Sequence, residues 1–236
     1  GEQDKVEDAF KIADSIVEIE LINNRIVPNS METRGAVANF NKEDGRYELS
    51  CSSQGVHSLR DRISNVLNIE PSEIRVITTD VGGGFGMKIF NYPEYICSLF
   101  ASKIIGRPVK WVSDRSEAFL SDTHGRDHVT KAKLALDKEG IFLGIKIDTV
   151  ANMGAYLSNF AIFIPTLAGT AMLAGCYKTP AIYVNVKGVF TNTNPVDAYR
   201  GAGRPEASFL IERLIDKSAR ELKISPLKIR EINLID

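Results

Sequence analysis

The most distinctive stretch of this sequence is a run of glycines whose backbone could bind a ligand. Residues 81–88 read VGGGFGMK, so a backbone with almost no side-chain bulk is interrupted by one aromatic ring, Phe85. Such a backbone adopts positive φ angles readily and brings its N–H groups close to a ligand. Between a strand and a helix it could bind an anion through those groups, although a glycine run is also typical of a tight turn.

Two familiar nucleotide-binding motifs do not fit this stretch. A P-loop requires Gly directly before its Lys and Ser or Thr after it, but Met87 precedes Lys88 and Ile89 follows. The dinucleotide motif GxGxxG, started at Gly82, requires Gly where the sequence has Met87. We therefore rank a nucleotide-binding domain below other functions.

Two further stretches lie at the same kind of boundary, where a predicted strand is followed by a helix. Gln54 precedes one predicted helix, and residues 198–205, AYRGAGRP, precede a longer one. Together the three stretches offer one amide, many backbone N–H donors and two arginines. This set suits a polar, anionic cofactor that brings its own reactivity.

Composition and charge are those of an ordinary globular chain. Of 236 residues, 44% are hydrophobic and 25% charged, and the formal net charge of −1 provides no field to attract nucleic acid or an anionic membrane. Cys51, Cys97 and Cys176 form no CxxC pair, which argues against disulfide, iron–sulfur and zinc sites and favours buried, reduced thiols. No apolar run reaches bilayer length and no signal peptide is apparent, so we expect a cytoplasmic protein.

Hydrophobic periodicity predicts the elements that must position these residues. Period-two alternation predicts strands and helical spacing predicts helices. We expect strands at 16–22, 35–40, 46–51, 73–80, 108–112, 129–136, 141–150 and 182–190, and helices at 56–67 and 93–105 and from 205 and 226 onward. Residues 152–175 have no clear period and predict either a buried helix broken at Pro165 or a packed loop. The mixture indicates an α+β fold, with mixed β-sheets and helices.

These motifs resemble those of a known family. VGGGFGMK and AYRGAGRPEA, with Gln54 located 31 residues before Phe85, are similar to the molybdopterin-binding large subunit of the xanthine oxidase family of molybdenum hydroxylases. Residues 9–34, 106–128 and 152–156 also resemble its aldehyde oxidase and carbon monoxide dehydrogenase branch. The resemblance implies one first molybdopterin-binding region over residues 1–236, as a single unit or as two sub-lobes.

The resemblance also implies roles for individual residues. The Gln54 amide would donate a hydrogen bond to the apical oxo ligand of molybdenum, and Arg200 would lie near the metal. The backbone around Phe85 would face the metal centre and the pterin. The cofactor-binding residues implied are Gln54, Gly83, Gly84, Phe85, Gly86, Arg200 and Gly201. None would coordinate the metal through a side chain, because in this family the pterin dithiolene does so.

Departures from the family's patterns bear on the substrate. The carbon monoxide dehydrogenases carry a copper-binding cysteine where this chain has Gly201, so Mo–Cu oxidation of carbon monoxide is not expected. Purine-oxidising members have polar anchors at the positions of Ile89 and Ala168, and Ala202 is apolar as well. An aldehyde needs no such anchors, so we expect these three residues to line a pocket for an aldehyde.

The chain is shorter than a complete large subunit, which also has a hammerhead-like N-terminal domain and a second molybdopterin domain. That second domain supplies the glutamate base, whereas Glu206 and Glu212 are expected to face solvent on the long helix. We therefore expect no catalytic residue here and a split or truncated enzyme, with the molybdenum cofactor at an interface with a partner. The implied partners are the rest of the large subunit, an iron–sulfur subunit with [2Fe–2S] clusters and an FAD subunit. The alternative is a non-catalytic molybdopterin-binding or assembly module.

Charged residues outside the motifs give weaker signals. Lys88 is expected to neutralise charge near the cofactor, and residues 126–128 are expected to form a structural polar network. His124 and His128 are four residues apart but are separated by Gly125, so we do not expect them to bind a metal.

Overall fold

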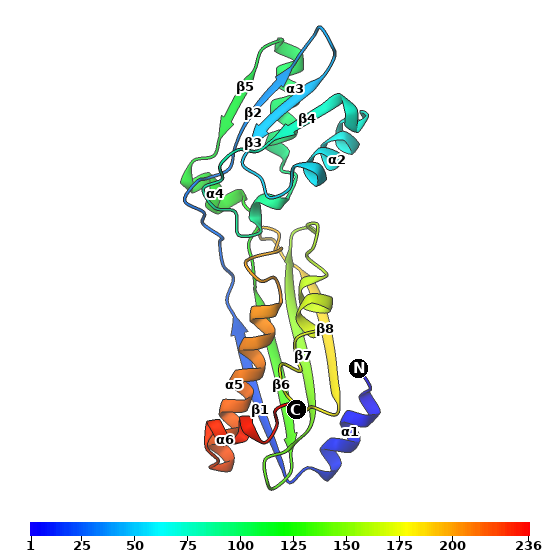
Figure 1. The fold of residues 1–236 in the computed structure, drawn as a ribbon, viewed down its shortest axis with the longest axis vertical. Helices are drawn as coiled ribbons and strands as arrows, with labels where there is room; N and C mark the ends of the chain where they lie inside the picture. Colours follow the sequence, from blue (N-terminus) through cyan, green and yellow to red (C-terminus); the bar gives the residue numbers. More distant parts are fainter. The chain divides into compact units, whose positions relative to one another are not determined.

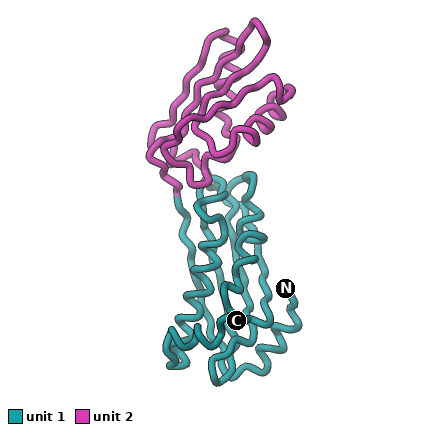
Figure 2. Tube along the Cα trace, in the orientation of Figure 1, with its two compact units in different colours: residues 1–26, 124–236 teal, residues 27–123 magenta.

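The protein, described by a computed structural model over all residues 1–236, consists of two compact units (Figure 2). Unit 1 comprises residues 1–26 and 124–236, and unit 2 comprises residues 27–123. Each unit has its own four-stranded mixed sheet and its own helices. The predicted α+β class is therefore confirmed.

Unit 1 contains a sheet with the strand order β1-β6-β7-β8 (Figure 1). The pairs β1–β6 and β6–β7 are antiparallel, and β7–β8 is parallel. The strands are β1 (Ser15–Asn23), β6 (His128–Leu136), β7 (Phe142–Gly154) and β8 (Ile182–Phe190). The connection from β7 to β8 includes a π-helical turn, η3 (Ile164–Ala168).

Helix α5 (Arg204–Leu222) covers this sheet because its apolar residues recur at helical spacing. Leu210 and Leu214 on the helix pack in one cluster with Leu134 and Ile145 of the sheet. Helix α6 (Pro226–Glu231) packs against α5 and begins where Ser225 Oγ accepts a hydrogen bond from the Leu227 N–H. Helix α1 (Gln3–Ile12) contacts β7 and β8.

Unit 2 contains a sheet with the order β4-β3-β2-β5. The strand β2 is antiparallel to both of its neighbours, and β3 is parallel to β4. The strands are β2 (Gly35–Phe40), β3 (Tyr47–Cys51), β4 (Ile74–Ile77) and β5 (Val109–Val112). The helices are α2 (Val56–Leu67), α3 (Pro93–Ile105) and α4 (Arg115–Ser121), with short 3₁₀ turns η1 (Pro71–Glu73) and η2 (Met87–Ile89).

Most predicted elements are confirmed, and the differences have simple reasons. The segment at 152–175 is neither a continuous helix nor a plain loop, since β7 extends to Gly154 and η3 follows after a series of turns. Periodicity does not predict α1, which buries only Val6, or α4, which has seven residues. No helix combines the length and apolar character required to cross a bilayer.

The three cysteines are free, and their burial differs from the expectation. Cys51 is buried, and burial raises the pKa of its thiol to about 12. Cys97 and Cys176 are exposed, so the prediction that all three thiols are buried is wrong.

Candidate functional site

In unit 2, Gln54 and the glycine loop of residues 82–86 lie together. Gln54 follows β3 and the loop follows β4, and because these strands are parallel their carboxyl ends meet at one edge of the sheet. The Gln54 Oε1 accepts hydrogen bonds from the N–H groups of Gly86 at 2.8 Å and Lys88 at 3.3 Å. Backbone N–H groups only donate, so the amide oxygen faces the loop. The NH₂ group of this exposed side chain therefore remains a donor.

This close approach requires glycine in the loop. A Cβ on Gly84 would lie 2.5 Å from Gln54 Oε1. Gly86 has a φ of 105°, in the region that glycine adopts without strain. Phe85 has a φ of 53° and is 42% exposed, and its ring lies over Gly83. The loop thus presents backbone and one aromatic ring at its surface.

Lys88 supports the loop from inside. Its side chain is buried, and its Nζ donates to the Glu32 backbone oxygen at 2.9 Å and to Glu32 Oε2 at 2.7 Å. The same Oε2 accepts from the Gly82 N–H at 2.9 Å. Burial opposes ionisation of Glu32, but these hydrogen bonds outweigh it and hold its pKa below the usual value. Lys88 is thus paired with Glu32 beneath the loop, and its role in neutralising cofactor charge stays a prediction.

In unit 1, the turn of residues 199–203 connects the segment after β8 to helix α5. Its last three residues, Gly201, Ala202 and Gly203, have φ angles of 98°, 44° and 88°. A Cβ on Gly203 would lie 2.4 Å from the backbone oxygen of Ile164, at the start of η3. The turn and η3 are therefore in close contact, which brings together the segments that carry Ala202 and Ala168. Arg200, within the turn, is exposed.

The two glutamates of α5 differ in environment. The Glu206 side chain is only 9% exposed, and its Oε1 lies 2.9 Å from Nη1 of Arg126. The prediction that Glu206 faces solvent is therefore wrong, because the first turn of α5 directs it inward to this guanidinium. Glu212 is 43% exposed and pairs with Arg230 at 2.8 Å.

The polar network expected at residues 126–128 is present in part. Arg126 pairs with Glu206, and Asp127 Oδ2 accepts hydrogen bonds from Arg25 Nε at 2.7 Å and from Asn152 Nδ2 at 2.9 Å. The His128 ring takes no part in these bonds, although it is buried. The structure contains no group of three or more His, Cys, Asp or Glu side chains arranged to hold a metal ion.

The predicted site residues thus form two groups. Unit 2 carries Gln54, Gly83, Gly84, Phe85 and Gly86, with Ile89 half-buried at the end of η2. Unit 1 carries Arg200 and Gly201 with Ala202 and Ala168. Sequence reasoning missed Arg126 and Glu206 as partners of the second group. Helical spacing could have predicted that Glu206 faces inward. It lies four and eight residues before the buried Leu210 and Leu214, and therefore on the same face of the helix.

This fold with its two glycine turns belongs to a defined class of cofactor-binding domain. The molybdopterin cofactor-binding domain family matches residues 1–234, and the chain belongs to this family. It is therefore a molybdopterin-binding domain of the molybdenum hydroxylases, as the sequence motifs predict.

Individual relatives are much longer than this chain. It is 35% identical to the carbon monoxide dehydrogenase large chain of Hydrogenophaga pseudoflava over 100% of this chain and 30% of that protein. Quinoline 2-oxidoreductase from Pseudomonas putida 86 has a TM-score of 0.93 and 33% identity, over 98% of this chain and 30% of that one. Aldehyde oxidoreductase from Desulfovibrio gigas has a TM-score of 0.88 and 26% identity, over 100% and 25% of the two chains. The chain thus spans at most about 30% of the length of these relatives.

Proposed function

We propose that Gln54 and the glycine loop of unit 2 bind a molybdenum–pterin cofactor, that the turn of residues 199–203 in unit 1 is also a cofactor-binding element, and that the chain is part of a hydroxylase that oxidises an aldehyde with oxygen derived from water. The observation that carries this proposal is the fixed amide of Gln54. Its oxygen is bound by the Gly86 N–H at 2.8 Å, so its NH₂ group is oriented as a donor. A metal oxo group is an acceptor that such a donor fits.

The other residues of the two groups also suit an anionic cofactor. Gly83 and Gly84 let the loop backbone pack closely against Phe85 and Gln54, and the exposed Arg200 guanidinium has donors that suit oxyanions. No side chain needs to ligate the metal. When bound, the cofactor supplies the redox chemistry and activates the oxygen that is transferred.

We propose that Gly201 excludes a copper site. The residue has no thiol, and its φ of 98° lies in the region that favours glycine. A Cβ at this position would lie 2.5 Å from Cγ of Pro205. A copper-binding cysteine therefore does not fit this turn without a shift, which supports a reaction other than Mo–Cu oxidation of carbon monoxide.

The proposed substrate is an aldehyde, with a nitrogen heteroaromatic ring as a second candidate. Ile89, Ala168 and Ala202 have no polar group with which to anchor a purine, and an aldehyde needs none. The second candidate is favoured by the 33% identity to quinoline 2-oxidoreductase, compared with 26% to the aldehyde oxidoreductase. Activity towards an aromatic aldehyde and towards quinoline distinguishes the two.

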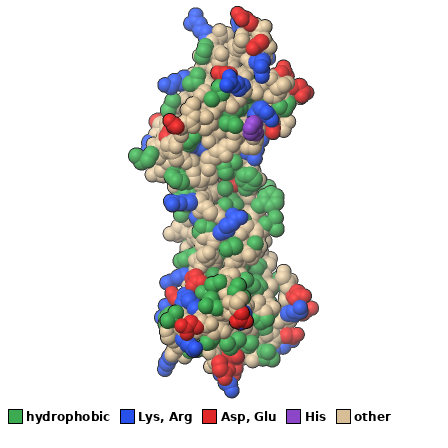
Figure 3. All heavy atoms as spheres, in the orientation of Figure 1, with side chains coloured by type: hydrophobic (Ala, Val, Ile, Leu, Met, Phe, Trp, Pro, Cys, Tyr) green, Lys and Arg blue, Asp and Glu red, His purple; other side chains and the backbone are tan.

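We propose that the remaining part of a large subunit packs on unit 1, and that an iron–sulfur subunit and an FAD subunit complete the enzyme. Hydrophobic side chains are visible among the charged ones on the surface (Figure 3). Around η3, Tyr156, Leu157, Phe163 and Leu167 are between 46% and 65% exposed. Apolar surface of this kind is typical of an interface with another polypeptide.

The test uses this chain co-expressed with a large-subunit remainder and measures molybdenum and pterin in the purified complex. Gln54→Glu keeps an oxygen acceptor for the Gly86 N–H but removes the outward donor, and Arg200→Ala removes the guanidinium. We expect each to lower cofactor content at least about tenfold, which corresponds to about 1.4 kcal/mol. The matched controls Gln3→Glu and Arg213→Ala, at exposed helix positions, should leave cofactor content unchanged.

Two outcomes would change the proposal. An active complex without molybdenum and pterin would disprove it. A complex that holds the cofactor but oxidises neither aldehyde nor quinoline would instead support a non-catalytic binding or assembly module.

A further inference from the structure

The guanidinium of Arg126 binds the backbone of the turn at residues 199–203. Nη1 donates to the Tyr199 oxygen at 3.0 Å, and Nη2 donates to the Arg200 oxygen at 2.9 Å. The guanidinium carbon also lies 5.0 Å from the centre of the Tyr199 ring. One planar group therefore holds the two carbonyl groups that directly precede Gly201.

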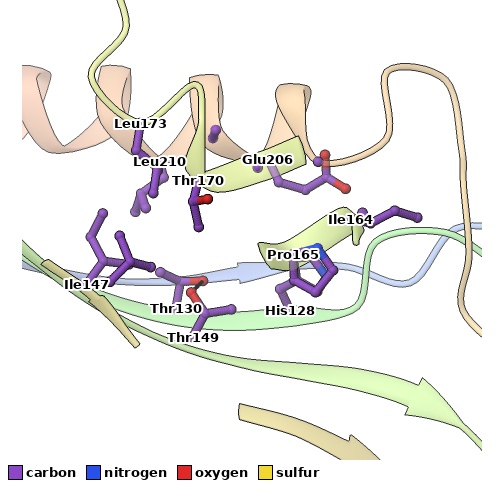
Figure 4. Close-up of a pocket in the computed structure, with 14 residues that line it drawn as sticks. His128, Thr130, Ile147, Thr149, Ile164, Pro165, Thr170, Leu173, Glu206 and Leu210 are labelled. Carbon is purple, nitrogen blue, oxygen red and sulfur yellow. Dashed lines mark hydrogen bonds between the residues drawn. The ribbon is translucent and has the colours of Figure 1, made fainter. Parts of the chain in front are cut away.

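Glu206 binds the same guanidinium of Arg126. Its Oε1 lies 2.9 Å from Nη1, and the two side chains are only 9% and 8% exposed. Glu206 lies in the first turn of α5, directly after the turn in sequence (Figure 4). Because each charge compensates the other, both can be buried. The Arg126–Glu206 pair thus connects the start of β6, the turn and the start of α5.

Glu206 also lines a small cavity. Oε2 is buried and has no hydrogen-bond partner in the protein. The cavity of about 40 Å³ is lined by polar side chains of β6 and β7 and by apolar residues of η3 and α5 (Figure 4). This volume is enough for a water molecule. The hydrogen-bond partner of the Glu206 carboxylate in the protein is Arg126.

The backbone around Arg126 is also built to approach the turn. A Cβ on Gly125 would lie 2.4 Å from Cβ of Tyr199, so only glycine allows this approach. The His124 N–H donates to the Pro195 oxygen at 2.9 Å, and the Asp197 N–H donates to the His124 oxygen at 2.8 Å. Residues 124–126 therefore run along the segment that leads into the turn.

We propose that Arg126 and Glu206 are positioning residues that hold the turn in its strained conformation and thereby orient Arg200. Three successive residues of the turn have positive φ, and one of them, Ala202, is not glycine. Such a conformation persists only where its surroundings enforce it. The orientation of Arg200 towards a cofactor rests on the proposed function. The stabilisation of the turn by Arg126 and Glu206 does not depend on it.

Amide hydrogen exchange of the whole chain without cofactor tests the proposal. The Ala202 N–H is bonded to the Tyr199 oxygen at 2.9 Å and reports whether the turn is closed. Arg126→Lys keeps the charge but loses the planar fork, so we expect exchange at Ala202 to rise at least about tenfold, with residues distant in unit 1 unaffected. Glu206→Gln keeps an acceptor, and we expect a smaller rise of roughly threefold.

Arg230→Lys is the matched control. Arg230 also bridges two acidic side chains of α5, Glu212 and Asp216, each at 2.8 Å, but it does not contact the turn. This variant tests whether loss of any guanidinium fork in unit 1 opens the turn, and it should leave exchange at Ala202 unchanged. Thermal unfolding of all three variants separates local opening from loss of global stability.

A rise confined to residues 199–204 in Arg126→Lys supports the proposal. Unchanged exchange at Ala202 in both Arg126→Lys and Glu206→Gln overturns it, as does an equal rise in Arg230→Lys. If Arg126→Lys does not fold, Glu206→Gln alone decides, because it conserves shape. The proposed function is tested separately by the cofactor content of Arg200→Ala, since Arg126 binds only the backbone oxygen of Arg200.

Discussion

At the scale of single residues, Gly84 is restricted by space and not by backbone conformation. Its φ lies outside the left-handed region that favours glycine, yet a Cβ would lie 2.5 Å from Gln54 Oε1. We expect Gly84→Ala to displace the Gln54 amide and break its hydrogen bond from Gly86. Because Gln54 is exposed and its amide can move, the expected loss in the free energy of unfolding is about 0.5–1.5 kcal/mol, the contribution of the broken hydrogen bond. Urea denaturation and amide exchange at Gly86 measure the two effects.

Gly45→Ala provides the complementary control. Gly45 has a φ of 71°, but nothing lies within 4 Å of the position of its Cβ. Its replacement should cost only the conformational energy of a left-handed residue, about 1–2 kcal/mol, and leave exchange at Gly86 unchanged. Unaltered protection of Gly86 in Gly84→Ala would show that the loop tolerates a side chain beside Gln54.

His128 provides a pH dependence of stability. Burial lowers its pKa, Glu206 and Asp127 partly oppose this effect, and Arg126 adds to it. The folded chain therefore keeps His128 neutral at pH values where the unfolded chain, with a pKa near 6.5, binds a proton. The free energy of unfolding should accordingly fall as the pH decreases below about 6.5, by at most about 1.4 kcal/mol per pH unit from this residue. It should stop falling on this account below the pKa of the folded state.

The measurement is urea denaturation between pH 7 and 5 for the wild type and His128→Gln. The variant has no imidazole to protonate, so its stability should depend less on pH over this range. Equal slopes in the two proteins would contradict the assignment of a neutral, buried imidazole.

At the scale of elements, Arg34 links β2 to two helices of unit 2. Its fully buried guanidinium donates to Asp122 after α4 and to Glu94 of α3, and it lies 3.7 Å from the centre of the Tyr92 ring. Arg34→Leu would remove the guanidinium that pairs with the buried Asp122 carboxylate. We expect a loss of about 3–5 kcal/mol in the free energy of unfolding of unit 2, measured by urea denaturation.

Arg75→Leu is the control for this prediction. Arg75 on β4 lies 3.7 Å from Glu48, and its side chain is 70% exposed. Exposed ion pairs contribute at most about 1 kcal/mol, so the control should change stability little. A similar loss in both variants would mean that the buried position of Arg34 is not what makes its ion pairs important.

The elements that could be predicted from sequence are those with a continuous apolar face. Helix α2 and strand β8 have the predicted bounds because their periodic pattern ends where a turn begins. The hydrogen bonds of Gln54 to Gly86 and of Arg126 to Glu206 could not be predicted, because they join residues 32 and 80 positions apart. Local patterns identify glycine turns, but only the packed structure shows what holds each turn in place.

At the scale of the whole molecule, unit 2 is inserted into unit 1 at one point. The N–H of Ile26 donates to the Gly125 oxygen at 3.0 Å, and the N–H of Gly125 donates to the Ile26 oxygen at 2.8 Å. The chain therefore leaves and re-enters unit 1 at neighbouring positions, as is common for inserted domains. Each unit also has its own sheet, so neither sheet needs strands from the other unit.

This arrangement predicts that the two units fold separately. Residues 27–123 expressed alone should unfold cooperatively in urea and retain the protection of Gly86. Residues 1–26 joined to 124–236 by a short Gly-Ser linker should retain the β1–β6 pairing and the closed turn at Ala202, because every partner of that turn named above lies in unit 1. Circular dichroism and amide exchange measure both outcomes. Loss of Ala202 protection in a linked unit 1 that keeps its β1–β6 pairing would show that unit 2 is needed to close the turn, and would contradict the assignment of that role to Arg126 and Glu206 alone.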